Sequence, residues 1–268
     1  MKANNANKLL PEIKQRIYQI RAELVNTHKR CGGTGYLPAE VSGQIYRCGC
    51  MIVFRYLKEL IKANIAQDYW SISFDNLKLD PLIRKIIGVY MKNIKRARQN
   101  GLGLVLFGQN GTGKTSVMSE IAKLAIVLGY DVRYFTLSSY VDAVYSKDSA
   151  RQDYYENGDF LMIDELDKKA GTANVYKLVD EFLRRMFNQN KSLILGTNWD
   201  SEEFKEHLGE STFSLLKRRC EFLDFQGEDF SDHLQDSYSS RLESDYNYFS
   251  SAIVEMASLR EENLTEEE

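Results

Sequence analysis

The sequence predicts an α/β fold with a parallel sheet flanked by helices. Three apolar runs of strand type, in Leu104–Phe107, Asp159–Glu165 and Ser192–Asn198, are typical of strands buried on both faces of a parallel sheet. Each run leads into glycine, acidic or amide residues, and ligands bind at the carboxyl ends of strands in open α/β sheets. The chain has 268 residues, of which 43% are hydrophobic. That length allows one core of about 150 residues plus a small additional module.

A phosphate-binding loop follows the first of these strands. The pattern G-x-x-x-x-G-K-[ST] begins at Gly108, and a helical run continues from Ser116 to Leu128. The glycines let backbone N–H groups close around a β-phosphate at a helix N-terminus. Lys114 then reaches the β- and γ-phosphates, and the Thr115 hydroxyl ligates Mg²⁺. The candidate nucleotide-binding residues of this loop are Gly108, Gln109, Asn110, Gly111, Thr112, Gly113, Lys114, Thr115 and Ser116.

Two acids, Asp164 and Glu165, end the second strand. Their position at the carboxyl end of a buried strand faces the ligand crevice. We expect Asp164 to hold Mg²⁺ through its water shell, and Glu165 to polarise the water that attacks the γ-phosphate. The alternative is a buried strand that ends in solvated acids. The phosphate-binding loop upstream favours the catalytic interpretation.

Further candidate catalytic residues come later in the chain. Asn198 ends the third strand, where its amide would position the lytic water or touch the γ-phosphate, although a strand-ending Asn is also an ordinary turn signal. Arg218 and Arg219 precede the strand-like run Glu221–Phe225. One of them would act as a finger on the γ-phosphate bound by a neighbouring subunit. The alternative is a solvated basic helix end that suits the helix dipole. We favour Arg218, with Arg219 as its close rival.

The order of these motifs resembles that of an AAA+ ATPase, and more narrowly that of the bacterial and phage helicase loaders of the DnaC/DnaI type. The resemblance covers roughly Ser73 to Gly227, including Phe74-Asp-Asn-Leu77 and the run Val132–Tyr140. It implies ATP and Mg²⁺ as cofactors, self-association through the AAA+ interface, and a replicative hexameric helicase and single-stranded DNA as partners. Hydrolysis would be slow and stimulated by DNA or the partner. Transposition helpers of the IstB type share the same core, so an ATP-dependent DNA-binding helper of that type is the alternative function.

Three of the four cysteines lie close to a histidine. His28 precedes Cys31 by three positions, and Cys48 and Cys50 follow as a Cys-x-Cys pair. Two close pairs on facing turns supply four ligands to a tetrahedral Zn²⁺. The region also resembles the zinc-binding amino-terminal domain with which DnaI-like loaders grip the helicase. His28 stands where that family more often has Cys, which leaves the fourth ligand open. The alternative is three free thiols and an unrelated histidine.

Charge and motif order divide the chain into three parts. We expect a mainly helical zinc-binding, helicase-interaction domain at 1–72, an AAA+ ATPase domain at 73–228 and an acidic tail with a helix at 229–268. Residues 1–100 hold 18 Lys and Arg against 7 Asp and Glu, whereas residues 221–268 hold 2 against 14. The basic third suggests contact with nucleic acid or an acidic helicase surface. With no signal peptide or membrane span recognised, we expect a cytoplasmic protein, in the host cytoplasm if a phage encodes it.

Hydrophobic periodicity predicts the helices between these motifs. We expect them at Pro11–Thr27, from Met51 to about Ile65, at Pro81–Arg98, at Ser138–Val144 and at Asn174–Gln189, with a polar loop at Ser146–Asn157. The third of these helices would turn Lys92, Lys95, Arg96 and Arg98 outward, as a face that touches a DNA backbone or is merely solvated. By the AAA+ resemblance, Tyr140 and Lys147 are candidates for lining a channel that holds single-stranded DNA.

Overall fold

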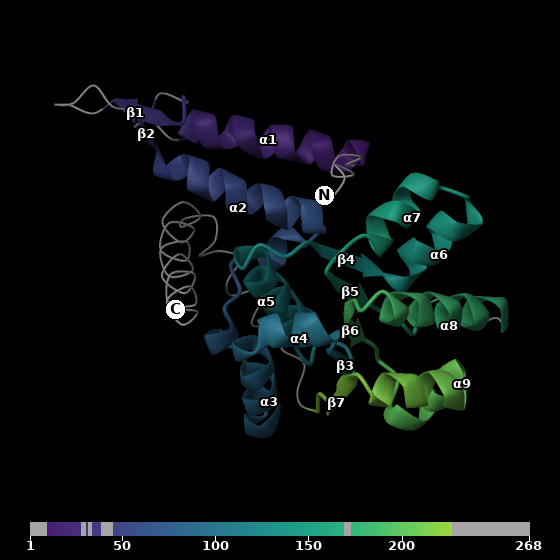
Figure 1. Cartoon of the computed structure of the whole chain (residues 1–268). Helices are drawn as coiled ribbons and strands as arrows, with labels where there is room; N and C mark the ends of the chain where they lie inside the picture. The colour runs from purple at the N-terminus through teal and green to yellow at the C-terminus, as the bar shows by residue number, and fades with distance from the viewer. Residues whose placement is uncertain (1–9, 28–30, 32–33, 39–44, 169–172, 227–268) are drawn as a thin grey trace.

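The computed structural model describes residues 10–226 except 28–30, 32–33, 39–44 and 169–172 (Figure 1). Within this part, five strands form a parallel sheet in the order β4-β5-β6-β3-β7. The strands are β3 (Gly103–Phe107), β4 (Val132–Thr136), β5 (Phe160–Asp164), β6 (Ser192–Gly196) and β7 (Cys220–Asp224). The predicted parallel sheet is confirmed.

Burial follows the place of each strand in the sheet. Every residue of β3, β5 and β6 is buried, and these are the three central strands. The edge strands β4 and β7 combine buried positions with partly exposed ones, and β7 also has exposed positions. Central strands of a parallel sheet are covered on both faces, so only continuous apolar runs fit there. This is why the three apolar runs of the sequence become the middle of the sheet.

Helices flank the sheet (Figure 1). Helix α5 leaves the carboxyl end of β3 and packs against β4, β5 and β6, while α8 packs on α9 and α9 packs on β7. The core helices are α3 (Pro81–Lys92), α4 (Ile94–Asn100), α5 (Lys114–Val127), α6 (Leu137–Tyr145), α7 (Ser149–Glu156), α8 (Ala173–Asn188) and α9 (Ser201–Lys217). Helix α9 is kinked at Gly209, whose φ is 78°, so the helix that leads to Arg218 is the second part of a bent element.

The amino-terminal module is a helical pair with a small hairpin. Helix α1 (Pro11–Thr27) lies along α2 (Gly49–Ala63), and β1 (Tyr36–Pro38) pairs with β2 (Ile45–Arg47) as an antiparallel hairpin between them (Figure 1). The expected helical spacing is confirmed, since Ile13, Ile17, Ile20, Leu57, Leu60 and Ile61 are buried. Leu60 is continuous with the hydrophobic core of the sheet domain. The module is therefore packed on the core.

Hydrogen bonds also join the module to the core. Asn64 ends α2 in the left-handed conformation, and its side chain donates to the carbonyl of Tyr134 on β4 over 3.1 Å. The Tyr154 hydroxyl on α7 donates to the carbonyl of Lys62 over 2.5 Å. The two 3₁₀ turns that follow, Gln67–Tyr69 and Phe74–Asn76, lead the chain from the module into the core.

Two local predictions were wrong. Most of the expected loop at Ser146–Asn157 is helix α7, because the Asp148 side chain caps its N-terminus and Tyr154 and Tyr155 are buried against the core. The expected single helix at Pro81–Arg98 is interrupted at Asn93, which lies between α3 and α4 with a φ of −107°.

Arg98 does not face outward as predicted. Arg98 turns inward, where its guanidinium donates to Asp159 over 2.8 Å and to the carbonyl of Asn190 over 2.8 Å. Arg98 is therefore a structural residue and does not belong to the proposed DNA-facing surface.

Candidate nucleotide-binding site

The phosphate-binding loop lies between β3 and α5, as predicted. Gly113 ends the loop with a φ of 94°, a conformation that side-chain-bearing residues rarely adopt, and the helix begins at Lys114. Helix α5 thus presents its free backbone N–H groups to the loop, and these groups with the helix dipole favour an anion. Among the predicted loop residues, Thr112, Lys114 and Ser116 are buried.

Lys114 folds back onto the loop in this structure. Its ammonium donates to the carbonyls of Gly108 and Gln109, over 2.5 and 2.7 Å, and to Oδ1 of Asn198, over 3.2 Å. Burial lowers the pKa of Lys114, whereas the carboxylates of Asp164 and Asp167 raise it. A bound phosphate would favour the charged ammonium further, since an opposite charge stabilises it.

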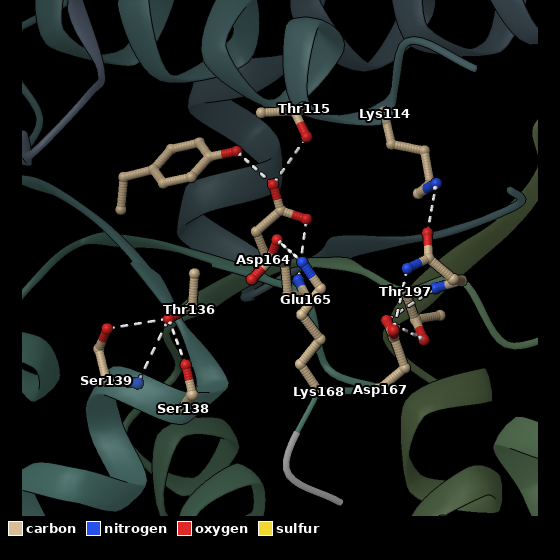
Figure 2. Close-up of polar contacts among 12 residues, drawn as sticks. Lys114, Thr115, Thr136, Ser138, Ser139, Asp164, Glu165, Asp167, Lys168 and Thr197 are labelled. Carbon is tan, nitrogen blue, oxygen red and sulfur yellow. Dashed lines mark hydrogen bonds and ion pairs between the residues drawn. The ribbon is translucent and has the colours of Figure 1, made fainter. Parts of the chain in front are cut away.

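Asp164 lies at the carboxyl end of β5, beside the start of α5. The Thr115 hydroxyl and the Tyr134 hydroxyl each donate to Asp164 Oδ2 over 2.8 Å (Figure 2). Burial raises the pKa of Tyr134, so the phenol stays protonated and acts as a donor. Gly196 on the next strand leaves room for this carboxylate, because a Cβ at that position would lie 2.6 Å from Asp164 Oδ1.

The donor set at Asp164 suits a magnesium ion. Mg²⁺ prefers oxygen ligands and keeps several waters while it binds through one or two carboxylates and substrate phosphates. The Thr115 hydroxyl and the Asp164 carboxylate supply oxygens at the place where the loop meets the strand. These two residues would hold the ion, as the sequence predicted.

Glu165 follows Asp164 with a φ of 55°, a left-handed conformation that residues other than glycine uncommonly adopt. Its backbone N–H donates to Asp164 Oδ1 over 2.9 Å, and its carboxylate forms an ion pair with Lys168 (Figure 2). That pair is solvent-exposed, and exposed pairs contribute little to stability. Glu165 is thus placed at the pocket and can exchange Lys168 for a water or substrate.

Asp167 holds Asn198, a contact that the sequence reasoning missed. Its two carboxylate oxygens accept from the backbone N–H and the side-chain amide of Asn198, each over 2.9 Å. The hydrogen-bond network assigns Oδ1 of Asn198 to the side that faces Lys114. The sequence indicates Asp164 and Glu165 as two adjacent acids at the end of a strand. Asp167, a third acid two positions further on, could have been found by the same criterion.

Substitution of Asp167 tests this arrangement. We expect Asp167→Asn to lower turnover about tenfold with little change in ATP affinity, because one of the two acceptors that orient the Asn198 amide becomes a donor. Steady-state kinetics and nucleotide titration measure the two effects, with the exposed Asp153→Asn as the matched control. Unchanged turnover in Asp167→Asn would contradict the role of Asp167.

A pocket of about 420 Å³ joins these groups. One end consists of the phosphate-binding loop with Asp164, Glu165, Asp167 and Asn198. The segment 67–79, which we call the strap, forms a further wall, and the strap residues that line the pocket are Tyr69, Ser71, Ile72, Ser73, Asn76, Leu77, Lys78 and Leu79. Tyr69 lies beside Thr115 and Asp164. With phosphates at the loop, the nucleoside would lie against the strap residues beyond Tyr69.

Comparisons with known proteins agree with this geometry. Residues 104–216 match the family model described as "ATPase family associated with various cellular activities (AAA)". A solved structure described as the DnaC helicase loader is similar with a TM-score of 0.52 and 20% identity, over 60% of this chain and 100% of that one. The core has the AAA+ ATPase fold. A search of curated proteins finds no match.

Two further solved structures are similar to this AAA+ core. The replication initiator DnaA bound to AMPPCP and single-stranded DNA has a TM-score of 0.50 and 13% identity, over 74% of this chain and 65% of that one. DnaI has a TM-score of 0.48 and 17% identity, over 63% and 98%. At these identities the likeness concerns the fold. The family match supports an ATPase, with nucleotide and Mg²⁺ as its ligands.

The two candidate finger arginines lie at the other end of the AAA+ sheet from the phosphate-binding loop. Arg219 precedes β7, and its carbonyl accepts from Gly103 at the amino-terminal end of β3. Its guanidinium donates to Asn190 over 2.8 Å, so it holds parts of its own chain together. Arg218 ends α9 and is exposed. Neither arginine lines the pocket of its own subunit.

The predicted zinc ligands are described in part. The sulfur atoms of Cys31, Cys48 and Cys50 lie within 4.8 Å of one another, and those of Cys31 and Cys50 are 3.6 Å apart. His28 lies outside the described residues. The acidic tail predicted at 229–268 lies outside them as well.

The candidate channel residues differ in exposure. Tyr140 is 1% exposed, and its hydroxyl bonds to Glu156 and Arg185, so a lining role for Tyr140 is wrong. Lys147 is exposed, with a φ of 55°. Tyr145, two residues before it, is 60% exposed. Across the described residues, no helix is both long and apolar enough to span a membrane.

Proposed function

We propose that this protein is an ATP-dependent helicase loader in DNA replication. The observation that carries the proposal is the nucleotide pocket with Lys114, Asp164 and Glu165, set in an AAA+ core that is similar to the DnaC helicase loader over the whole of that structure. The likeness to the initiator DnaA supports a role in replication at the level of fold.

The residues of the pocket divide the work of ATP hydrolysis. The α5 N-terminus and Lys114 would bind the β- and γ-phosphates, and Thr115 and Asp164 would hold Mg²⁺, which would neutralise phosphate charge. Glu165 takes a proton from the attacking water, which Asn198 orients. Charge that develops on the transferred phosphoryl group needs a further cation. Arg218 of an adjacent subunit supplies it in trans, so isolated subunits hydrolyse ATP slowly.

The cysteine cluster supports zinc as a structural ion of the amino-terminal module. Tetrahedral Zn²⁺ with Zn–S bonds of about 2.3 Å places its sulfur ligands about 3.8 Å apart, close to the 3.6 Å between Cys31 and Cys50. Burial and the neighbouring thiols raise the pKa of Cys50 to about 12, a condition that a bound cation reverses because it stabilises thiolates. Cys31, Cys48 and Cys50 would be three ligands, and we assign His28 as the fourth.

Metal content tests this assignment. We expect one zinc ion per chain in protein purified without chelator, and loss of the module's helical signal after chelation, since metal binding supplies much of the folding free energy of so small a unit. Elemental analysis and circular dichroism measure these results. His28→Ala should lower the zinc content while Cys220→Ala should not, since Cys220 is buried on β7. Protein without zinc would remove the claim.

The proposed partners fit different surfaces. The module of α1, the hairpin and α2 would hold a replicative hexameric helicase. Single-stranded DNA would meet the exposed Tyr145 and Lys147, because bases stack on aromatic rings while lysines neutralise phosphates. Self-association would bring Arg218 of one AAA+ core to the pocket of the next.

Copurification separates this proposal from the IstB-type alternative. Tagged protein with ATP should retain a hexameric replicative helicase from the same genome, and a variant with Cys31, Cys48 and Cys50 all changed to Ser should not. If the AAA+ core alone bound the partner, the triple Ser variant would retain that partner as well as the wild-type protein does. Retention of a transposase in place of the helicase would favour the transposition helper.

A further inference from the structure

A buried ion pair on α5 lies outside the nucleotide pocket. Lys123 is 2% exposed and Glu120 is 9% exposed, and the two side chains form an ion pair one turn apart on the helix. Neither residue lines the nucleotide pocket. Ion pairs removed from water carry a desolvation cost, which their attraction offsets only when further hydrogen bonds satisfy both groups.

Those further hydrogen bonds all go to the strap. The Lys123 ammonium donates to the carbonyls of Tyr69 and Trp70, over 3.2 and 3.3 Å, and to that of Ile72. Glu120 Oε2 accepts from the backbone N–H of Phe74 over 2.9 Å. The strap is neither strand nor regular helix over most of its length, so these side chains replace the backbone partners that secondary structure would supply.

The strap also connects the nucleotide pocket with the amino-terminal module. Tyr69 and Ile72 line the pocket directly, and both bond through their carbonyls to Lys123. Trp70, between them, is buried and packs under the guanidinium of Arg16 on α1 at 5.5 Å from the ring centre. The ion pair therefore fixes the wall of the pocket that the strap forms.

We propose that Lys123 and Glu120 are positioning residues that hold the strap against the nucleoside end of the pocket and so set the affinity for the nucleoside part of ATP. This rests on the proposed binding of ATP in that pocket. Burial lowers the pKa of Lys123 and raises that of Glu120, and each group's charge opposes that shift in the other. Apolar residues at both positions would pack α5 but would leave three strap carbonyls without a donor.

Calorimetric titration with two ligands tests the proposal. ATP contacts both ends of the pocket, whereas inorganic tripolyphosphate contacts only the phosphate end. We expect Lys123→Met, which keeps the length of the side chain, to weaken ATP binding about tenfold or more, because hydrogen bonds from a charged donor are lost. Binding of tripolyphosphate should stay within about threefold. The control is Lys177→Met, which removes an exposed lysine paired with Glu181 on α8.

The outcomes separate the claims. Equal weakening of both ligands, or no weakening of ATP, would overturn the positioning role. If circular dichroism shows that Lys123→Met does not fold, Glu120→Gln gives the same comparison, with a selective loss of about threefold or more expected for ATP. Wild-type protein that binds neither ligand would refute the proposed function itself. Wild-type and Lys123→Met proteins that bind both ligands identically would refute only this inference.

Discussion

Lys114→Ala is expected to weaken ATP binding by more than about 100-fold, because it removes the lysine ammonium held at the loop that we propose binds the β- and γ-phosphates. The ammonium already donates hydrogen bonds to two loop carbonyls and to Oδ1 of Asn198, so the phosphates would meet a donor that is already in place. Isothermal titration with ATP and Mg²⁺ measures the effect. Normal affinity in Lys114→Ala would sink the assignment of the site.

Glu165→Gln is the matched control, since it leaves every phosphate ligand in place. We expect normal ATP affinity with turnover lowered by about 10² or more, because the amide cannot accept the proton of the attacking water. A second control, Lys168→Ala, frees Glu165 from its exposed ion pair and should preserve both binding and turnover. If Glu165→Gln hydrolyses ATP at the normal rate, the general base lies elsewhere.

Arg218→Ala should lower partner-stimulated ATP turnover by about 10³ without loss of ATP binding, since a finger arginine acts on the transition state and not on the bound substrate. Arg218 is exposed at the end of α9 and outside its own pocket. Arg219→Ala is the control variant at the neighbouring position. Arg219 bonds to Asn190 within its own chain, so its loss should affect stability more than turnover.

Mixed oligomers decide whether Arg218 acts in trans. A subunit carrying Arg218→Ala keeps its pocket, and a subunit carrying Lys114→Ala keeps its arginine. Each alone should be inactive, and a mixture should recover part of the activity where the two meet in the correct order. Full DNA-stimulated activity in an Arg218→Ala, Arg219→Ala double variant would show that the pair is only a solvated helix end.

Local patterns in the sequence were enough to predict the central sheet and the phosphate end of the site. Continuous apolar runs fit only the doubly covered strands β3, β5 and β6, and the glycine-rich loop has a fixed relation to the helix that follows it. Helix α7 was missed because Tyr154 and Tyr155 form its buried face through contacts with residues distant in sequence. Arg98 was misplaced for the same reason, since Asp159 and Asn190 lie far along the chain.

The strap end of the site was outside the reach of local pattern. Phe74-Asp-Asn-Leu77 drew attention only through the family resemblance, and nothing in its composition places Tyr69 or Leu79 in a pocket with the phosphate-binding loop. Tyr134 would be read as an ordinary strand residue, yet its hydroxyl bonds to Asp164. Such pairings depend on strand order in the sheet, which periodicity does not determine.

Helicase deposition on circular single-stranded DNA tests the central claim most directly. A closed circle has no end on which a ring can thread, so a hexameric helicase needs a loader to enter it. We expect this protein with ATP to increase the amount of helicase bound to circles coated with single-strand-binding protein. The variants Lys114→Ala and Arg218→Ala should either fail to increase the bound helicase or fail to release the helicase after it is deposited. Equal deposition of the cognate helicase with and without the protein would contradict the account.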